Sequence, residues 1–249
     1  MTGRSRFKYI ETAPNSTKLD ARLDFDEVVD RLKAHSDSAA VAGMVRFGIN
    51  PSNTFGVSIP VIRKMAKEIG RDHGLAQKLW ASQIHEARIL ATMIDDPQKV
   101  TAKQMEGWVK DFDSWDVCDQ CCSNLFDKTP FAYQKALDWS SRKEEFVKRA
   151  AFALMASLAV HDKQAKNSQF ETLLPLIERE SIDDRNFVRK AVNWALRQIG
   201  KRNLPLNRLA IKTAKQILEK KSSSARWVAS DAIRELTSPS VRRKIGKIR

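Results

Sequence analysis

The stretch Trp115–Cys122 brings two carboxylates, an indole and three thiols together within eight residues. If it forms one helix, Trp115, Asp119 and Cys122 share a face through their i, i+4, i+7 spacing, and Asp116 lies at the edge of that face. A carboxylate beside an indole, on a concave face that also presents cations, can stabilise a positively charged sugar during glycosidic bond cleavage. It can also position a water molecule.

A structural role accounts for Asp116 better than for Asp119. Asp116 would sit in the first turn, after a cap at Asp113 or Ser114, where its negative charge complements the helix dipole. Asp119 lies one turn further on, where a buried carboxylate needs a partner of its own. We therefore regard Asp119 as the candidate for chemistry.

The cysteines do not predict a metal site. A closed zinc site needs four ligands at suitable spacing, and no second Cys or His pair follows Cys118, Cys121 and Cys122. A Cys–His nucleophile is equally unsupported, because the histidines are scattered at His35, His73, His85 and His161. We predict three small buried cysteines and no bound metal.

These side chains need a scaffold, and the sequence predicts one made of helices alone. No segment shows the period-2 alternation of a half-buried strand, which indicates an all-α protein. The pairs Thr101/Gln104 and Ser168/Glu171 have capping-box spacing. The predicted helices are 22–34, 38–47, 60–70, 73–81, 83–95, 102–112, 114–127, 130–139, 143–160, 169–180, 184–201, 205–221, 224–236 and 239–247.

A repeated motif predicts how the helices are stacked. Phe146, Phe187 and Trp227 open similar segments at spacings of 41 and 40 residues, with a second helix between each pair. This period is typical of two-helix solenoid repeats of the HEAT type. We expect the Phe, Val and Ala of each motif to pack against neighbouring repeats, leaving the basic residues between them to line one exposed, curved face.

Positive charge is concentrated at the C-terminal end. The 249-residue chain carries a formal charge of +14, yet residues 1–200 hold 30 basic and 27 acidic side chains, whereas residues 201–249 hold 14 and 3. A concentrated basic segment is typical of proteins that bind polyanions, nucleic acid above all. A solvated basic surface without a specific partner remains the alternative.

The composition also bounds the class of protein. No apolar run approaches the roughly 20 residues of a membrane span, and the first 20 residues are polar and lack the apolar core of a signal peptide. We expect a cytoplasmic protein, associated with the nucleoid in a bacterium. The predicted organisation is a loose extension over 1–20, a single domain over 21–237 and a basic tail over 238–249.

Four motifs in order give the chain a resemblance to a known family. They are the segments 55–63, 114–119, 146–151 and 188–197, which contain Phe55-Gly56-Val57-Ser58, Ser114-Trp115-Asp116, Val147-Lys148-Arg149 and Val192-Asn193-Trp194. Together they make residues 40–237 similar to the AlkD family of DNA alkylation-repair glycosylases, which are built from HEAT-like repeats. The resemblance implies removal of cationic N3- and N7-alkylated purines, such as 3-methyladenine and 7-methylguanine, from double-stranded DNA, by a monomer without a metal or organic cofactor.

The resemblance also implies roles for individual residues. The family's catalytic aspartate falls on Asp119, its sugar-contacting tryptophans on Trp115 and Trp194, and its active-site arginine on Arg149. We predict DNA contacts, several of them to phosphates, at Arg149, Arg197, Lys148, Arg189, Lys190 and Ser58. Two departures, Ser58 in place of a longer polar side chain and Ser157 in place of a Lys, concern fine DNA contacts and leave the catalytic set complete.

Other interpretations fit part of the pattern. A HEAT-like scaffold that binds nucleic acid or an acidic protein without catalysis explains the composition and the repeats. It does not explain why an acidic group should stand in a phosphate-binding cleft with Trp115, Arg149 and Trp194. A third interpretation, a thiol or metal enzyme that uses Cys118–Cys122, has the least support.

Overall fold

The computed structural model describes residues 23–246. The predicted extension over residues 1–20 lies outside these residues, as do the last three residues of the predicted tail. Within 23–246 the chain forms fifteen α-helices and one 3-10 helix, without a strand, which confirms the all-α prediction. None of these helices has the length and apolar character that crossing a lipid bilayer requires.

The helices follow one another with short connections. Their bounds are α1 (Phe25–Ala34), α2 (Ser38–Arg46), α3 (Ile59–Ile69), α4 (His73–Ala81), α5 (His85–Ile94), α6 (Ala102–Lys110), α7 (Trp115–Asn124), η1 (Phe126–Lys128), α8 (Ala132–Trp139), α9 (Glu145–His161), α10 (Asn167–Glu171), α11 (Leu174–Glu180), α12 (Asn186–Gly200), α13 (Leu204–Leu218), α14 (Ser223–Leu236) and α15 (Pro239–Gly246).

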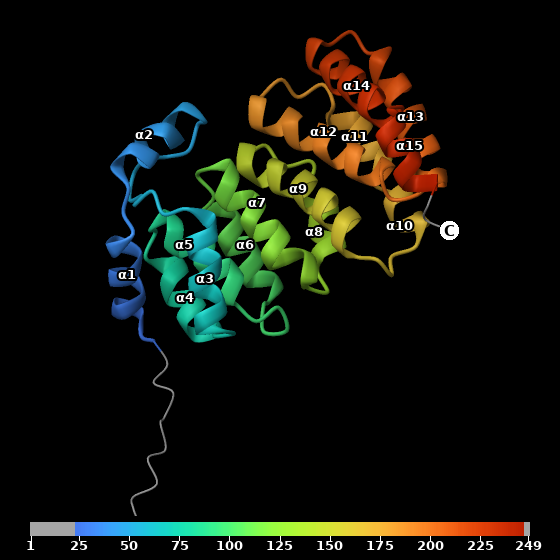
Figure 1. Ribbon diagram of the computed structural model, residues 1–249. Coiled ribbons are helices and arrows are strands. Elements are labelled where there is room, and N and C mark those ends of the chain that lie inside the picture. Colours follow the sequence, from blue (N-terminus) through green and yellow to red (C-terminus); the bar gives the residue numbers. More distant parts are fainter. Residues whose placement is uncertain (1–22, 247–249) are drawn as a thin grey trace, which may run out of the picture.

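Neighbouring helices stack into a row that runs through the molecule in chain order, with α2 standing apart at one end (Figure 1). The most extensive packing joins α9 to α12, followed by α13 to α14 and α7 to α9. Each helix therefore contacts mainly its sequence neighbours and the equivalent helix of the next repeat. This is the arrangement that a two-helix solenoid requires.

Helix α9 forms the centre of the core because it is apolar on every side. Every residue from Ala150 to Ala159 is buried, including five alanines that let adjacent helices approach closely. A helix that is apolar all round is stable only when surrounded by other helices. Here α7, α8 and α12 surround it.

The repeated motif packs largely as predicted. Val147, Val188 and Val228 are buried, and the rings of Phe146 and Phe187 lie 5.6 Å apart across the α9–α12 contact. Trp227 differs, because it lies one turn inside α14 and is 39% exposed. The period therefore predicted the stacking correctly, but the third aromatic ring lies at the surface.

One predicted helix is wrong. The segment 169–180 forms two short helices, α10 and α11, with a break at Thr172 and Leu173. Pro175 explains the break, since it has no N–H to donate to Glu171 and its ring would clash with that carbonyl. The predicted Ser168/Glu171 capping box is also wrong, because α10 begins at Asn167 and Ser168 lies within it.

The start of the predicted basic tail is folded. Pro239 opens α15, and Val241 and Ile245 on that helix are buried. The basic side chains Arg242, Arg243 and Lys244 of the same helix are exposed. Residues 239–246 therefore end the stack as a helix that displays cations.

Candidate active site

A pocket of about 450 Å³ opens between the middle helices of the stack. The predicted residues Trp115, Asp119 and Trp194 all line it, although Trp194 is 75 residues further along the chain than Asp119. We call this cavity the site pocket. Its lining comes from α3, α7, α9 and α12 and consists of Ile59, Trp115, Asp116, Asp119, Gln120, Ser123, Ser157, Val160, His161 and Trp194.

Asp119 has the partner that its position in the second turn demanded. Arg149 on α9 donates from Nε to Oδ1 at 3.0 Å and from Nη2 to Oδ2 at 2.7 Å, a bidentate ion pair. The third guanidinium nitrogen, Nη1, donates to the backbone carbonyl of Phe187 at 2.6 Å. The carboxylate is therefore held rigidly at the pocket wall, with its side chain 19% exposed.

Burial and ion pairing act on Asp119 in opposite directions. Burial raises the pKa of Asp119 above its ordinary value, and the charge and hydrogen bonds of Arg149 offset only part of this increase. The negative charge of Asp116 adds to the increase. The anionic form of Asp119 is poorly solvated, so a positive charge placed near the carboxylate stabilises that form.

Trp115 is oriented by contacts on two sides. Its indole Nε1 donates to the backbone carbonyl of Phe47 at 3.0 Å, and the Arg149 guanidinium lies 5.8 Å from its ring centroid. A further bond, from Asn50 Nδ2 to Asp113 Oδ2 at 2.9 Å, ties the loop after α2 to the start of α7. The segment after α2 thus fixes one wall of the site pocket, and the Phe47 side chain beside it is 71% exposed.

The geometry combines a carboxylate with two indoles in one pocket of a helical stack, the arrangement that the family resemblance implies. The family model that matches the chain is described as DNA alkylation repair enzyme and covers residues 28–236. The protein belongs to this family. The resemblance to the AlkD-type DNA alkylation-repair proteins is thereby confirmed.

A solved structure supports the same fold. It represents a new family of proteins related to the HEAT-like repeat DNA glycosylases with affinity for branched DNA structures, and it superposes with a TM-score of 0.72. The two sequences are 20% identical, and the match covers 86% of this chain and 95% of the other. The HEAT-like solenoid is therefore confirmed. No curated protein matches the chain.

Within this alkylation-repair fold, three cations predicted to contact DNA instead face carboxylates of the protein. Besides Arg149, these are Lys148, which bonds Glu180 and lies 3.2 Å from Asp183, and Arg197, which bonds Glu235 and lies 3.7 Å from a carboxylate oxygen of Asp231. Their charges are neutralised by neighbouring repeats. These ion pairs compete with the predicted phosphate contacts of Arg149 and Arg197 and with the predicted DNA contact of Lys148, which stay predictions.

The other predicted contacts are more open. Arg189 stacks on Trp227, with its guanidinium 5.2 Å from the ring centroid, and Lys190 is exposed beside it. Ser58 is exposed at the N-terminal cap position of α3, where its hydroxyl makes no capping bond. These three residues remain predicted DNA contacts.

Sequence reasoning missed a buried histidine behind Asp116. His85 is 5% exposed, and its Nε2 lies 2.9 Å from Asp116 Oδ2. Burial alone would lower the pKa of His85, but the hydrogen bond and charge of Asp116 raise it above the ordinary value, with help from Glu86 and Asp113. Burial alone would raise the pKa of Asp116, but the hydrogen bond and charge of His85 lower it below the ordinary value. Asp116 is thus an anion paired with a cation, not only a complement to the helix dipole.

Glu86 is a second missed residue, and it positions the loop that leads to α3. It is 1% exposed, and its carboxylate accepts backbone N–H bonds from Phe55, Gly56 and Val57 at 2.6 to 3.2 Å. Gly56 has a φ of +81°, and a Cβ there would lie 2.2 Å from the carbonyl oxygen of Asp37. A carboxylate among the apolar residues of α5 was the available signal, since a buried carboxylate needs donors.

The three cysteines are buried, as predicted. Burial raises the pKa of Cys121 and Cys122 well above the ordinary value, so both are protonated thiols at neutral pH and weak nucleophiles. Across residues 23–246 there is no group of three His, Cys, Asp or Glu side chains that could hold a metal ion.

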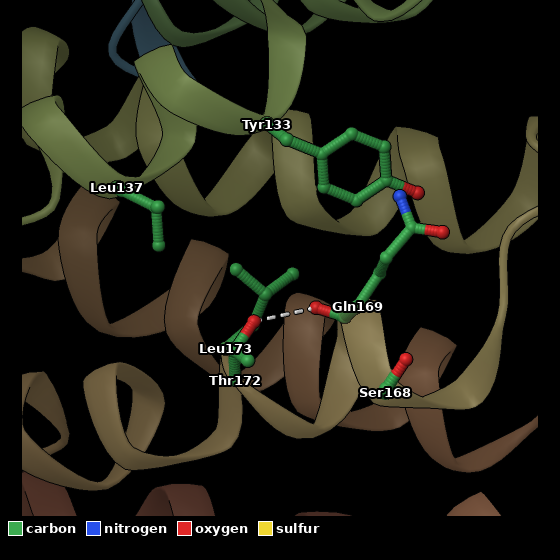
Figure 2. A pocket seen from close by; sticks show the side chains of 6 residues that line it. All are labelled: Tyr133, Leu137, Ser168, Gln169, Thr172 and Leu173. Carbon is green, nitrogen blue, oxygen red and sulfur yellow. Dashed lines mark hydrogen bonds between the residues drawn. The ribbon is translucent and has the colours of Figure 1, made fainter.

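A different pocket, of about 340 Å³, lies on α8, α10 and the break that follows α10 (Figure 2). The Tyr133 ring and the Gln169 side chain lie along one side, and the hydroxyl of Thr172 donates to the Gln169 carbonyl at 2.8 Å. Its lining is Tyr133, Leu137, Ser168, Gln169, Thr172 and Leu173, which includes no carboxylate or cation. The site pocket, with its two aspartates, is therefore the stronger candidate for chemistry.

Proposed function

We propose that this protein is a DNA glycosylase that removes cationic N3- and N7-alkylated purines, such as 3-methyladenine and 7-methylguanine, from double-stranded DNA in base excision repair. The observation that carries the proposal is that Asp119, Trp115 and Trp194 line one pocket, with the carboxylate of Asp119 fixed by a buried arginine. Membership of the DNA alkylation repair family supports it. We further propose that it acts as a monomer.

The chemistry follows from the charge of the lesion. An alkylated purine already carries a positive charge, so the base leaves with the electron pair of its bond to C1′ and becomes neutral without being protonated. Positive charge then develops on the deoxyribose. The Asp119 carboxylate and the π faces of Trp115 and Trp194 stabilise this charge, each more strongly in the transition state than in the ground state.

Asp119 keeps room for a water molecule despite its ion pair. An ionised carboxylate offers about four acceptor positions, and Arg149 occupies one on each oxygen. The remaining positions accept a hydrogen bond from water, whose oxygen attacks C1′ and whose proton passes to the carboxylate or to solvent. Arg149 is accordingly a positioning residue that fixes the direction of attack.

The test is release of free bases from methylated duplex DNA in EDTA by the wild-type protein and by Asp119→Asn. We expect the wild type to release 3-methyladenine and 7-methylguanine and the variant to be about 100- to 1,000-fold slower, the usual loss when one electrostatic contributor is removed. A circular dichroism melt checks that the variant is folded. No release by the folded wild type would reject the glycosylase.

A second candidate function is DNA binding without base excision. Two observations favour it: both oxygens of Asp119 already contact Arg149, and the solved neighbour is described by its affinity for branched DNA. Binding of a four-way junction and of a duplex with the same sequence distinguishes the two functions. A protein that prefers the junction at least tenfold and releases no base would be a structure-specific binder.

A further inference from the structure

A cavity with a strongly positive lining adjoins the site pocket. It has a volume of about 430 Å³ and lies between the loop after α9, the α12–α13 connection and α15. We call it the cationic pocket. Its lining contains no carboxylate and four cations, which are Lys163, Lys201, Arg202 and Lys244. The other lining residues are Ala159, Val160, Ala165, Gln198 and Asn203.

Most of this positive charge is not neutralised within the protein. Lys163 and Lys244 are exposed and form no ion pair among the described residues. Lys201 bonds Glu235 at 2.7 Å, but that carboxylate is shared with Arg197. The pocket therefore has a surplus of positive charge, in contrast to Lys148, Arg149 and Arg197, which face carboxylates.

Arg202 adds a cation that is held in place without a carboxylate. It donates from Nη1 to the Ala159 carbonyl at 2.8 Å and from Nη2 to the Ala165 carbonyl at 3.3 Å, and its guanidinium stacks 4.2 Å from the Phe170 ring centroid. Its Nε is buried and has no hydrogen-bond partner. Burial lowers the pKa of Arg202, and the nearby Tyr133 and Asp162 offset only part of this decrease.

The two pockets share a wall. Val160, in the last turn of α9, lines both of them, and its neighbour His161 lines the site pocket. The cationic pocket therefore lies next to the position that a nucleotide at Asp119 would occupy, within reach of the backbone of the same strand. Phosphodiesters are the regular anions of such a strand, and Lys and Arg are the side chains that bind them.

We propose that the cationic pocket binds a backbone phosphodiester of the DNA strand beside the damaged nucleotide. This rests on the proposed function, since it assigns a phosphate position to the same DNA. It adds contacts at Lys163, Lys201, Arg202 and Lys244 to the phosphate contacts predicted at Arg149 and Arg197. The pocket holds the strand and takes no part in bond cleavage.

The test measures the affinity for undamaged duplex DNA against salt concentration in Lys163→Ala/Lys244→Ala. Each phosphate neutralised contributes about 0.9 to the slope of log K against log salt, so we expect a slope flatter by about one unit. Lys212→Ala/Lys215→Ala, which removes two exposed lysines of α13 that line neither pocket, is the control of equal charge and should change the slope by less than half as much. Lys163→Arg/Lys244→Arg keeps the charge and should keep the wild-type slope.

Three outcomes overturn the proposal: equal slopes in the alanine variant and the wild type, equal flattening in the control, or loss of slope in the arginine variant. Titration with inorganic phosphate at constant ionic strength separates a free phosphate ligand from a phosphodiester. Saturable phosphate binding that the alanine variant loses, without any change in its DNA slope, would assign the pocket to free phosphate. Because the duplex is undamaged, the result does not depend on glycosylase activity, and a protein that releases no base can still confirm the phosphate site.

Discussion

The cations on α9 and α12 and those that line the cationic pocket are used differently. Lys148, Arg149 and Arg197 each contact carboxylates of a neighbouring helix, whereas Lys163 and Lys244 contact none among the described residues. The first group fixes the geometry of the stack and of the site pocket. The second group is free to attract a polyanion. The number of positive residues in a segment is thus a poor guide to where DNA is bound, and the number left unpaired is a better one.

The largest expected effect concerns Arg149, whose two possible roles predict opposite results. If it positions Asp119, Arg149→Gln lowers the rate of base excision at saturating DNA by about 100-fold, and the salt dependence of DNA binding is unchanged. A slope flatter by about one unit would instead make it a phosphate contact and remove the contrast between the two groups. Arg149→Lys, which keeps the charge but loses the bidentate geometry, should have an intermediate rate.

The same variant has a pH signature. In the proposed mechanism base excision requires ionised Asp119, so the rate should fall as pH decreases through the pKa of this group, which lies above the ordinary value. Arg149 lowers that pKa while burial raises it, so its removal leaves the effect of burial and moves the acidic limb of the rate profile to higher pH. A limb that stays in place in Arg149→Gln would mean that another group controls it.

The effect expected from Asp116→Asn is on the stability of the fold. The raised pKa of His85 stabilises the fold below about pH 6.5, and this contribution is lost as pH rises through the raised value. The lowered pKa of Asp116 stabilises it above about pH 4, and that contribution is lost as pH falls through the lowered value. The pair is therefore fully effective between about pH 4 and 6.5.

Within that window, Asp116→Asn should lower the free energy of unfolding by about 3 kcal/mol, the cost of breaking a buried pair. At pH 9, where a smaller fraction of His85 is protonated, the loss should be smaller. Urea unfolding at pH 5.5 and at pH 9 measures both. Asp30→Asn, which breaks the exposed pair with Lys33, is the control and should change little at either pH. An equal loss at both pH values would show that His85 is not charged.

The smallest effect on DNA binding is expected for Lys148→Gln. Its charge already faces Glu180 and Asp183, so the salt slope should stay at the wild-type value while the free energy of unfolding falls by about 1–2 kcal/mol. Lys163→Gln should do the reverse, with a flatter slope and unchanged stability. Identical behaviour of the two variants would end the distinction between paired and unpaired cations.

Local patterns in the sequence predicted most of the helices but not their partners. Apolar periodicity within each helix was sufficient to predict the all-α class. The 40-residue spacing of the repeated motif was sufficient to predict the stacking of α9 on α12. The break at Pro175 was missed although its cause lies in the sequence, because the apolar pattern continues across it. Trp115, Asp119 and Trp194 were placed by the family resemblance, and the structure brings all three to one pocket.

The contacts that define the site join residues 30 to 40 positions apart, between one repeat and the next. Asp119–Arg149 and His85–Asp116 are of this kind, as is Lys148–Glu180. Which way a side chain points around its helix, and which carboxylate it meets there, depends on the crossing of two helices. No pattern within a single helix contains that information, so the cations of the repeated motif could not be divided into paired and free from the sequence.

Glu86 has a consequence for how the loop before α3 tolerates mutation. Its carboxylate binds the amides of residues 55, 56 and 57, and amides are the same whatever the side chain. Positions 55 and 57 therefore need only an apolar residue other than proline, which lacks the N–H, while position 56 accepts glycine alone, since any other residue would meet the Asp37 carbonyl. A library covering every substitution in this loop should show one invariant position between two permissive ones, with position 86 as its distant, equally invariant counterpart.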